Sequence, residues 1–316
     1  MRLASRENRP ILVTASFIVL ILAIGTAYTL TTQGRASFIS ANYLLQQLQV
    51  ASFLGIVAAG MMLVILLGHI DLSVPWTIAA AAMMATAVGG SWALPVGLGV
   101  GLAVGLFNGF GVAYLRVPSM IFTLGVNAVL RGLMILHTGG FAPQTQSTGL
   151  MEFLAVGRVF GVPMALVVWA ALSIAVVIML SRTTLGRYIY AVGNREAAAY
   201  LSGIDTRLVL VAAFVLCGLC AGLSGVLLAG YSTKAYQGMG DAYLLPAIAA
   251  VVIGGTNILG GQGRYAGTVM GAILITLLTS VLSVMQIEES GRQVIYGLVI
   301  IVMLLLYGRS STNRRA

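Results

Sequence analysis

The chain has 316 residues, of which 59% are hydrophobic and only 8% are charged, and its formal net charge is +9. A soluble domain carries about 25% charged residues, so this composition excludes a water-soluble globule and indicates a polytopic membrane protein. The basic residues are scattered without a dense Lys/Arg run, which argues against nucleic acid as a partner.

Charges, prolines and glycines divide the chain into about ten apolar segments, which predict an all-α transmembrane bundle. They cover residues 11–31, 46–67, 74–90, 94–115, 118–137, 161–181, 207–230, 242–254, 265–285 and 293–308. Most reach the roughly 20 residues that a membrane-spanning helix needs, although the third and eighth are short. We expect one transmembrane domain, residues 1–316, whose first segment is too long for a signal peptide and is retained.

The basic residues predict the orientation of these spans. Ten crossings from a cytoplasmic N-terminus return the C-terminus to the cytoplasm. The inner side then collects 12 of the 17 basic residues, namely Arg2, Arg6, Arg9, Arg116, Arg182, Arg187, Arg195, Arg207, Arg264, Arg309, Arg314 and Arg315. The outer side collects Arg35, Arg158, Lys234 and Arg292, while Arg131 lies within a span. Because Lys and Arg accumulate in cytoplasmic loops, this asymmetry supports cytoplasmic termini.

Glycines recur at every fourth position of the fourth apolar segment, at Gly97, Gly101, Gly105 and Gly109. One face of this helix is therefore nearly bare, which lets a neighbouring backbone come close. The spacing returns at Gly218 and Gly222 and at Gly267 and Gly271. The pattern predicts tight helix packing and by itself indicates no function.

Two glycine-punctuated polar stretches interrupt the apolar pattern. Broken helices at membrane depth are tolerated only where the backbone faces protein or a water-filled cavity, so they often mark transport pathways. The candidate pathway residues in the breaks are Gly68, His69, Asp71 and Ser73, followed by Gly254, Gly255, Thr256 and Asn257. The predicted crossings place both breaks on the cytoplasmic side.

Asp71 is the acidic residue set most deeply in the apolar sequence, where a carboxylate costs roughly 2.5–3.5 kcal/mol. It could belong to a substrate path or a proton relay. Alternatively, it could cap, together with Ser73, the helix that starts near Pro75, and we favour this structural role. His69 is interpreted as a local hydrogen-bonding group.

Three further polar residues lie inside apolar segments and are candidates for the pathway. Arg131 could snorkel, pair with a carboxylate or line the path. Asn108 and Asn127 could contact substrate hydroxyls or, as is commoner, hydrogen-bond to neighbouring helices.

Residues 194–205 form a polar, helix-forming island between two uncharged segments. A short alanine-rich helix in this position is typical of a cytoplasmic element that docks on another protein. The alternative is an amphipathic loop at the membrane interface, which more often carries larger apolar residues. The candidate docking residues are an apolar face of Ala197, Ala198 and Leu201, the orienting charges Arg195 and Glu196, and their neighbours Asn194, Ser202 and Gly203.

No pattern of reactive residues indicates an enzyme, since the sequence lacks H-E-x-x-H and G-x-S-x-G. It also lacks the G-x-x-x-x-G-K-[ST] loop that binds nucleotide phosphates. A nucleotide that drives this protein must therefore be bound by another chain. Cys217 and Cys220 lie within an apolar segment, where a packing role is favoured over a redox or metal role.

Four blocks of the sequence together resemble the ribose/xylose-type permeases of ATP-driven (ABC) sugar importers. The stretch 68–74 is similar to the family pattern G-G-I-D-L-S-V-G, and 117–125 to P-P-F-I-A-T-L-G. The stretch 194–204 is similar to N-x-x-A-A-x-L-S-G-I, and 248–263 to A-I-A-A-V-V-L-G-G-T-S-L-x-G-G-x-G. The blocks keep the family's order, and the resemblance covers about residues 45–308. The chain departs from these patterns at His69, Pro75, Ser119 and Met120, which bears on the substrate more than on the class.

The resemblance implies an integral permease of the bacterial inner membrane that works as a dimer with an identical or paralogous chain. It implies two cytoplasmic subunits that bind ATP, so this chain itself holds no cofactor. It also implies a periplasmic binding protein that delivers the sugar. The 194–205 island would then be the coupling helix, seated in a cleft of the ATPase.

The principal alternative is a proton-coupled secondary transporter of a small solute, with Asp71 as the relay. This alternative predicts uptake that follows the proton gradient and needs no ATPase. It also predicts that the Asp71→Asn variant uncouples transport.

Overall fold

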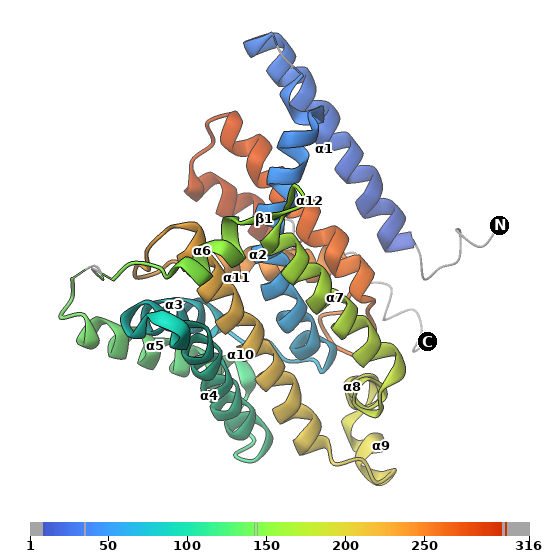
Figure 1. Cartoon of the computed structure of the whole chain (residues 1–316). Coiled ribbons are helices and arrows are strands. Elements are labelled where there is room, and N and C mark those ends of the chain that lie inside the picture. Colours follow the sequence, from blue (N-terminus) through green and yellow to red (C-terminus); the bar gives the residue numbers. More distant parts are fainter. Residues whose placement is uncertain (1–8, 35, 142, 144, 299–300, 302–316) are drawn as a thin grey trace.

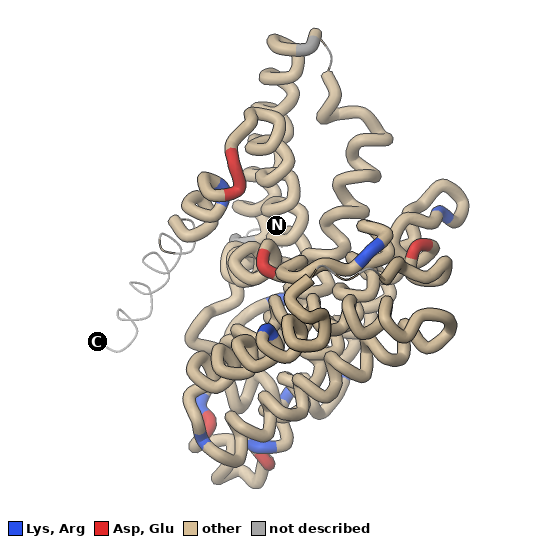
Figure 2. The backbone as a smooth tube through the Cα atoms, turned by 90° about the vertical axis from the view of Figure 1, so that its left-hand side faces the viewer, with Lys and Arg blue, Asp and Glu red and all other residues tan. Residues whose placement is uncertain are grey.

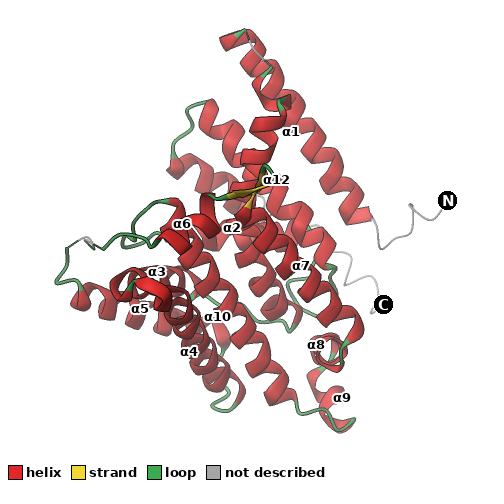
Figure 3. Cartoon of the chain, viewed as in Figure 1, coloured by secondary structure: helices red, strands yellow, loops and turns green. Residues whose placement is uncertain are grey.

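The computed structural model describes residues 9–34, 36–141, 143, 145–298 and 301. The described part is almost entirely helical (Figure 3), as the sequence predicts. The long helices are α1 (Arg9–Gln33), α2 (Ala41–Leu66), α4 (Ala93–Ala113), α5 (Ser119–His137), α7 (Met164–Arg182), α10 (Thr206–Tyr231) and α12 (Tyr265–Val284). The shorter ones are α3 (Val74–Val88), α6 (Gly149–Val156), α8 (Thr184–Asn194), α9 (Glu196–Leu201) and α11 (Leu244–Ile253).

Short 3-10 turns and one hairpin complete the described elements. The turns are η1 (Ser37–Ile39), η2 (Gly90–Trp92) and η3 (Asp241–Tyr243). The hairpin pairs β1 (Arg158–Val159) antiparallel with β2 (Val162–Pro163). Helix α6 and β1 lie between the fifth and sixth predicted segments, and β2 occupies the first residues of the sixth, 161–181. A further helical stretch covers residues 289–298.

Seven helices among the described residues are long and apolar enough to cross a membrane. They coincide with seven of the predicted segments to within a turn or two. The third and eighth predicted segments form α3 and α11, of 15 and 10 residues, both shorter than the roughly 20 that span a bilayer. The last predicted segment, 293–308, and the basic residues Arg2, Arg6, Arg35, Arg309, Arg314 and Arg315 lie wholly or partly outside the described residues. The protein is therefore a polytopic, all-α membrane protein, and its exact number of crossings stays a prediction.

Helix α2 lies at the centre of the bundle, with every residue from Ala51 to Leu66 buried. Helices α7, α10, α11 and α12 pack around it, and α3 is covered by α4 and α10. Figure 1 shows α1 leaning out from the bundle, and α5 lies at the opposite flank. Both of these outer helices expose most of their apolar side chains, as expected where lipid or another membrane chain replaces water.

The glycine stripe of α4 faces α10, which confirms the predicted tight packing. A methyl group on Gly105 would come within 2.5 Å of the Phe214 carbonyl oxygen, and one on Gly101 would clash with the Gly218 carbonyl. The second predicted pair, on α10, is thus the partner surface of the first. Helix α12 uses the same device, since Gly267 and Gly271 lie directly against the backbone of α11 and its C-terminal Gly254.

The predicted helix over 194–205 is wrong in its extent. Helix α8 ends at Asn194, and Arg195 has an extended backbone with φ −163° and ψ 97°. Only Glu196–Leu201 then forms the helical turn α9. Gly203 turns the chain at φ +84°, and the Asp205 side chain caps α10 by accepting from the Arg207 and Leu208 amides. Because an N-cap residue such as Asp205 does not have helical backbone angles, the C-terminal part of the 194–205 island forms the turn between α9 and α10.

Candidate functional site

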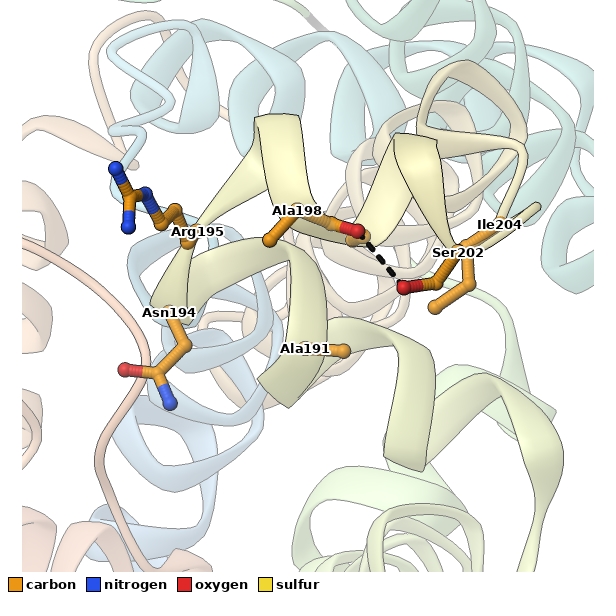
Figure 4. A pocket seen from close by; sticks show the side chains of 7 residues that line it. Ala191, Asn194, Arg195, Ala198, Ser202 and Ile204 are labelled. Atoms are coloured by element: carbon orange, nitrogen blue, oxygen red, sulfur yellow. Dashed lines mark hydrogen bonds between the residues drawn. The ribbon is translucent and has the colours of Figure 1, made fainter.

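The α8–α9 corner forms one end of the molecule, at the bottom of Figure 1. A groove of about 470 Å³ runs along this corner, lined by Ala191, Asn194, Arg195, Ala198, Ala199, Ser202 and Ile204. Figure 4 shows Asn194 and Arg195 where the two helices join and Ser202 with Ile204 at the far end. The Ser202 hydroxyl donates to the Ala198 carbonyl at 2.9 Å, which closes the last turn of α9.

Seven of the eight predicted docking residues are exposed, the exception being the partly buried Glu196. Leu201 is the most prominent of them, with 85% of its surface accessible. Its neighbour Tyr200 is 69% exposed and was missed by the sequence analysis. The signal in the sequence that could have indicated Tyr200 is an aromatic residue next to Leu201 in an alanine-rich turn, because aromatic side chains are enriched in protein interfaces.

Glu196 makes internal contacts that the sequence did not predict, and its proposed role of orienting a partner stays a prediction. Its carboxylate pairs with the Arg116 guanidinium at 2.9 Å and accepts from the Thr206 hydroxyl at 3.1 Å. The side chain therefore ties α9 to the loop between α4 and α5 and to the start of α10. Because 80 residues separate Glu196 from Arg116, no local sequence pattern predicts this pair.

The same end of the molecule is basic. Arg116, Arg182, Arg187, Arg195 and Arg207 are all exposed there, around α8 and α9. Figure 2 shows charged residues gathered at this lower end of the tube. The guanidinium of Arg207 lies 5.4 Å from the Tyr114 ring centroid, in a cation–π contact. Positive charge at this end agrees with the side that the sequence analysis assigns to the cytoplasm.

The two helix breaks lie against each other. The Gly261 amide donates to the Leu66 carbonyl at 2.8 Å, which joins the second break to the end of α2. Gly260 approaches the Gly68 amide so closely that a methyl group would lie 2.8 Å from it. Gly68, Gly255, Gly260 and Gly261 all have positive φ, which explains glycine at these sharp turns. The second break and the last residue of α2, Leu66, also lie against Gly193 at the C-terminal end of α8.

Asp71, Ser73 and Asn108 form a fully buried polar cluster. Asp71 Oδ1 accepts from the Ser73 amide at 2.9 Å and the Ser73 hydroxyl at 2.6 Å. Asn108 Nδ2 donates to Ser73 Oγ at 2.7 Å and to Asp71 Oδ1 at 3.3 Å. Helix α3 begins at Val74 with Ser73 as its N-cap residue, but no side-chain hydrogen bond caps it, so the predicted helix cap is wrong. Asp71 instead closes the turn before the helix, while Asn108 ties that turn to α4.

The other candidates in the first break and on α5 lie in separate contacts. His69 Nδ1 is 3.2 Å from the Ser119 hydroxyl, so two residues that depart from the family patterns touch each other. Asn127 Oδ1 accepts from the Trp76 amide at 3.3 Å. The Arg131 guanidinium lies 5.8 Å from the Trp76 ring centroid. Arg131 thus has an aromatic partner, which the sequence analysis did not identify.

The residues of the second break support its own turn. The Asn257 side chain accepts from the Leu259 amide at 3.0 Å, and its amide donates to the Gln262 carbonyl at 2.8 Å. Thr256 is buried, and its hydroxyl has no hydrogen-bond partner within the described chain. Gly254 ends α11 against α12.

The cysteines and the potential metal ligands complete the candidate groups in the described residues. No group of three His, Cys, Asp or Glu side chains there could hold a metal ion. Cys217 and Cys220 are both buried and free, consistent with packing. A helical membrane bundle whose helix breaks lie against each other is an arrangement that often occurs in transport proteins.

The comparisons with known proteins identify the family. Residues 43–304 match the family model described as branched-chain amino acid transport system / permease component, and the chain belongs to this family. It is 36% identical over 299 residues to the ribose import permease protein RbsC of Escherichia coli K12, with 92% of each chain covered. These findings confirm the resemblance seen in the four sequence blocks.

More distant relatives have related descriptions. The chain is 33% identical over 285 residues to the ribose import permease protein RbsC of Bacillus subtilis, with 87% of each chain covered. It is 32% identical over 281 residues to the autoinducer 2 import system permease protein LsrC of Salmonella paratyphi B, covering 87% of this chain and 80% of the relative. No solved structure matches the chain with statistical significance.

Proposed function

We propose that the chain is the membrane permease subunit of an ATP-driven bacterial importer and that it translocates a sugar. The family assignment and the ribose import permeases among the relatives support this proposal. A periplasmic binding protein would deliver the sugar, and a separate cytoplasmic subunit would bind and hydrolyse ATP. The lack of a nucleotide-binding loop in this sequence fits that division of labour.

The observation that carries the proposal is the exposed α8–α9 corner. Leu201 and Tyr200 project from it, and the groove beside them exposes Ala198 within a polar and basic rim. An apolar centre with a polar rim is the usual composition of a protein interface. We assign this surface to the ATPase, with Asn194, Arg195, Ala197, Ala198, Leu201, Ser202 and Gly203 as its contact residues.

The topology completes the proposed assembly. Ten crossings with both termini in the cytoplasm would place the docking corner on the side where ATP is available. The 316 residues would form one transmembrane domain in the inner membrane. The outer faces of α4 and α5 expose apolar side chains that include Phe107, Phe110 and Leu124, and a second permease chain would cover part of this surface.

The assembly can be tested by gentle detergent purification of the tagged chain from its host, followed by mass spectrometry. We expect a stoichiometric soluble ATPase, and any paralogous permease would appear in the same preparation. A preparation that lacks an ATPase and still supports uptake driven by a proton gradient would contradict the proposal and favour the secondary transporter.

The docking surface can be tested with Leu201→Asp and Ala198→Trp. Placing a charge on the apolar centre or filling the groove should reduce recovery of the ATPase by about tenfold or more, as loss of an interface anchor does. Leu150→Asp is the matched control, because Leu150 is 44% exposed on α6 and far from the docking corner in Figure 1. Glu196→Lys is a poorer test, since it breaks the internal pair with Arg116. Normal recovery and normal uptake in both variants would refute this docking surface.

A further inference from the structure

The C-terminal turn of α8 contacts the second helix break and also Leu66, the last residue of α2, which lies two residues before Gly68 of the first break. Gly193 lies so close to Leu66 that any Cβ would clash with the Leu66 carbonyl and would lie 2.9 Å from the Gly261 amide nitrogen. One residue further on, the Asn194 Cα would lie 2.9 Å from a methyl group on Gly261. Three segments that are distant in the sequence therefore meet backbone to backbone.

Two hydrogen bonds hold this meeting point together. The Gly261 amide donates to the Leu66 carbonyl at 2.8 Å. The Tyr190 hydroxyl, one turn before Asn194, donates to the Gly263 carbonyl at 2.9 Å. Burial raises the pKa of the Tyr190 hydroxyl, so it remains a hydrogen-bond donor at physiological pH. The end of α2, which leads into the first break, thus contacts α8 through Leu66, and the second break is attached to α8 through Gly261 and Gly263.

This arrangement is stiff for a physical reason. Side chains between two helices can change rotamer and absorb a small displacement, whereas directly contacting backbones cannot. Helix α8, which makes these contacts, is separated from α9 by a single residue, Arg195. A rigid shift of α9 with α8 must therefore move the end of α2 and the 254–264 loop as well.

We propose that this coupling junction, formed by Tyr190, Gly193, Leu66 and Gly261, transmits movement of the docked ATPase to both helix breaks. Tyr190 and Gly193 are then positioning residues, which link ATP hydrolysis to opening of the pathway without touching substrate or nucleotide. The inference rests on the docking role proposed for α9, and it adds the route by which both breaks move together.

The test uses the whole importer in proteoliposomes and measures three quantities: ATPase recovered with the permease, ATP hydrolysed, and substrate transported per ATP. Tyr190→Phe removes a single hydrogen bond and leaves the fold intact. We expect it to retain the ATPase and its hydrolysis while transport per ATP falls by about fivefold, the factor that one net hydrogen bond represents. Gly193→Ala, which forces α8 away from Leu66, should reduce transport per ATP further.

Matched controls separate this effect from general damage. Tyr188→Phe makes the same change on the exposed side of α8, and Gly149→Ala adds a methyl group at the start of α6, where no atom lies within 4 Å. Both should transport like the unmodified protein. If Tyr190→Phe keeps the wild-type ratio of transport to ATP, or loses uptake and hydrolysis in equal proportion, the junction does not carry the coupling. That result would leave docking intact, whereas loss of the ATPase from the unmodified permease would overturn docking and, with it, this proposal.

Discussion

Asp71 shows how a buried carboxylate can be held in a membrane bundle by uncharged partners. Ser73 donates twice to it and Asn108 approaches from α4, so three groups depend on a single acceptor. Because a buried donor that loses its partner costs about 1–3 kcal/mol, removal of the Asp71 side chain is far more damaging than loss of its charge. The two possible roles of Asp71 can therefore be separated by conservative and truncating variants.

We expect Asp71→Asn to retain uptake within about threefold of the unmodified protein, since the amide oxygen can still accept from Ser73. Asp71→Ala should lower the yield of folded permease, because the Ser73 and Asn108 donors lose their acceptor. Uptake assays together with size-exclusion profiles measure both effects. Complete loss of uptake in a well-folded Asp71→Asn protein would instead support a proton relay.

At the scale of elements, the α4–α10 contact illustrates what small residues do in a membrane. Lipid tails are as apolar as the side chains they replace, so association of the helices depends on close packing. Gly97, Gly101 and Gly105 permit this by placing α4 directly against the backbone or side chains of α10. Asn108 continues the same face and reaches Ser73, so this contact also positions the first helix break.

Gly101→Ala should destabilise the bundle by about 1–3 kcal/mol, the usual cost of overpacking. Gly99→Ala, two residues away on the exposed face of the same helix, should be neutral or slightly stabilising because alanine favours helix. Thermal unfolding in detergent, followed by loss of the monodisperse peak, compares the two variants. Equal midpoints would mean that the close approach of α4 and α10 does not determine stability.

At the scale of the whole molecule, charge and burial divide the chain between two ends. The α8–α9 corner, with five exposed arginines, lies at one end of α7 and α10, and the connections that hold Arg158 and Lys234 lie at the opposite ends of these two helices. The bundle between them is mainly apolar. This division agrees with the orientation predicted from the basic residues, in which the α8–α9 corner faces the cytoplasm.

Cysteine labelling can test the orientation directly. In intact cells stripped of the outer membrane, a membrane-impermeant maleimide should modify Lys234→Cys but not Ser202→Cys, which should react only after permeabilisation. The native Cys217 and Cys220 are only 1% and 6% exposed and provide a low background. The reverse labelling pattern would place the docking corner outside and remove the basis for an ATPase partner.

The sequence by itself determined the all-α membrane class, the bounds of seven long helices, the glycine faces and the permease family. These properties follow from composition and from the short-range spacing of residues, both of which can be read within a single helix without knowing its neighbours. It also located the polar 194–205 island and both breaks, because polar residues stand out against an apolar background.

Only the tertiary structure decided which of these features act together. The Glu196–Arg116 pair, the Asp71–Asn108 contact and the junction of Gly193 with Leu66 and Gly261 each join residues from 37 to 195 positions apart, a separation that no periodicity reports. The end of α9 was likewise misjudged because alanine propensity favours a longer helix, whereas the Asp205 cap and the Gly203 turn stop it. The spacing of residues along the chain predicts which face of a helix carries small or apolar side chains, and only the packing of the helices shows which of these faces contact each other.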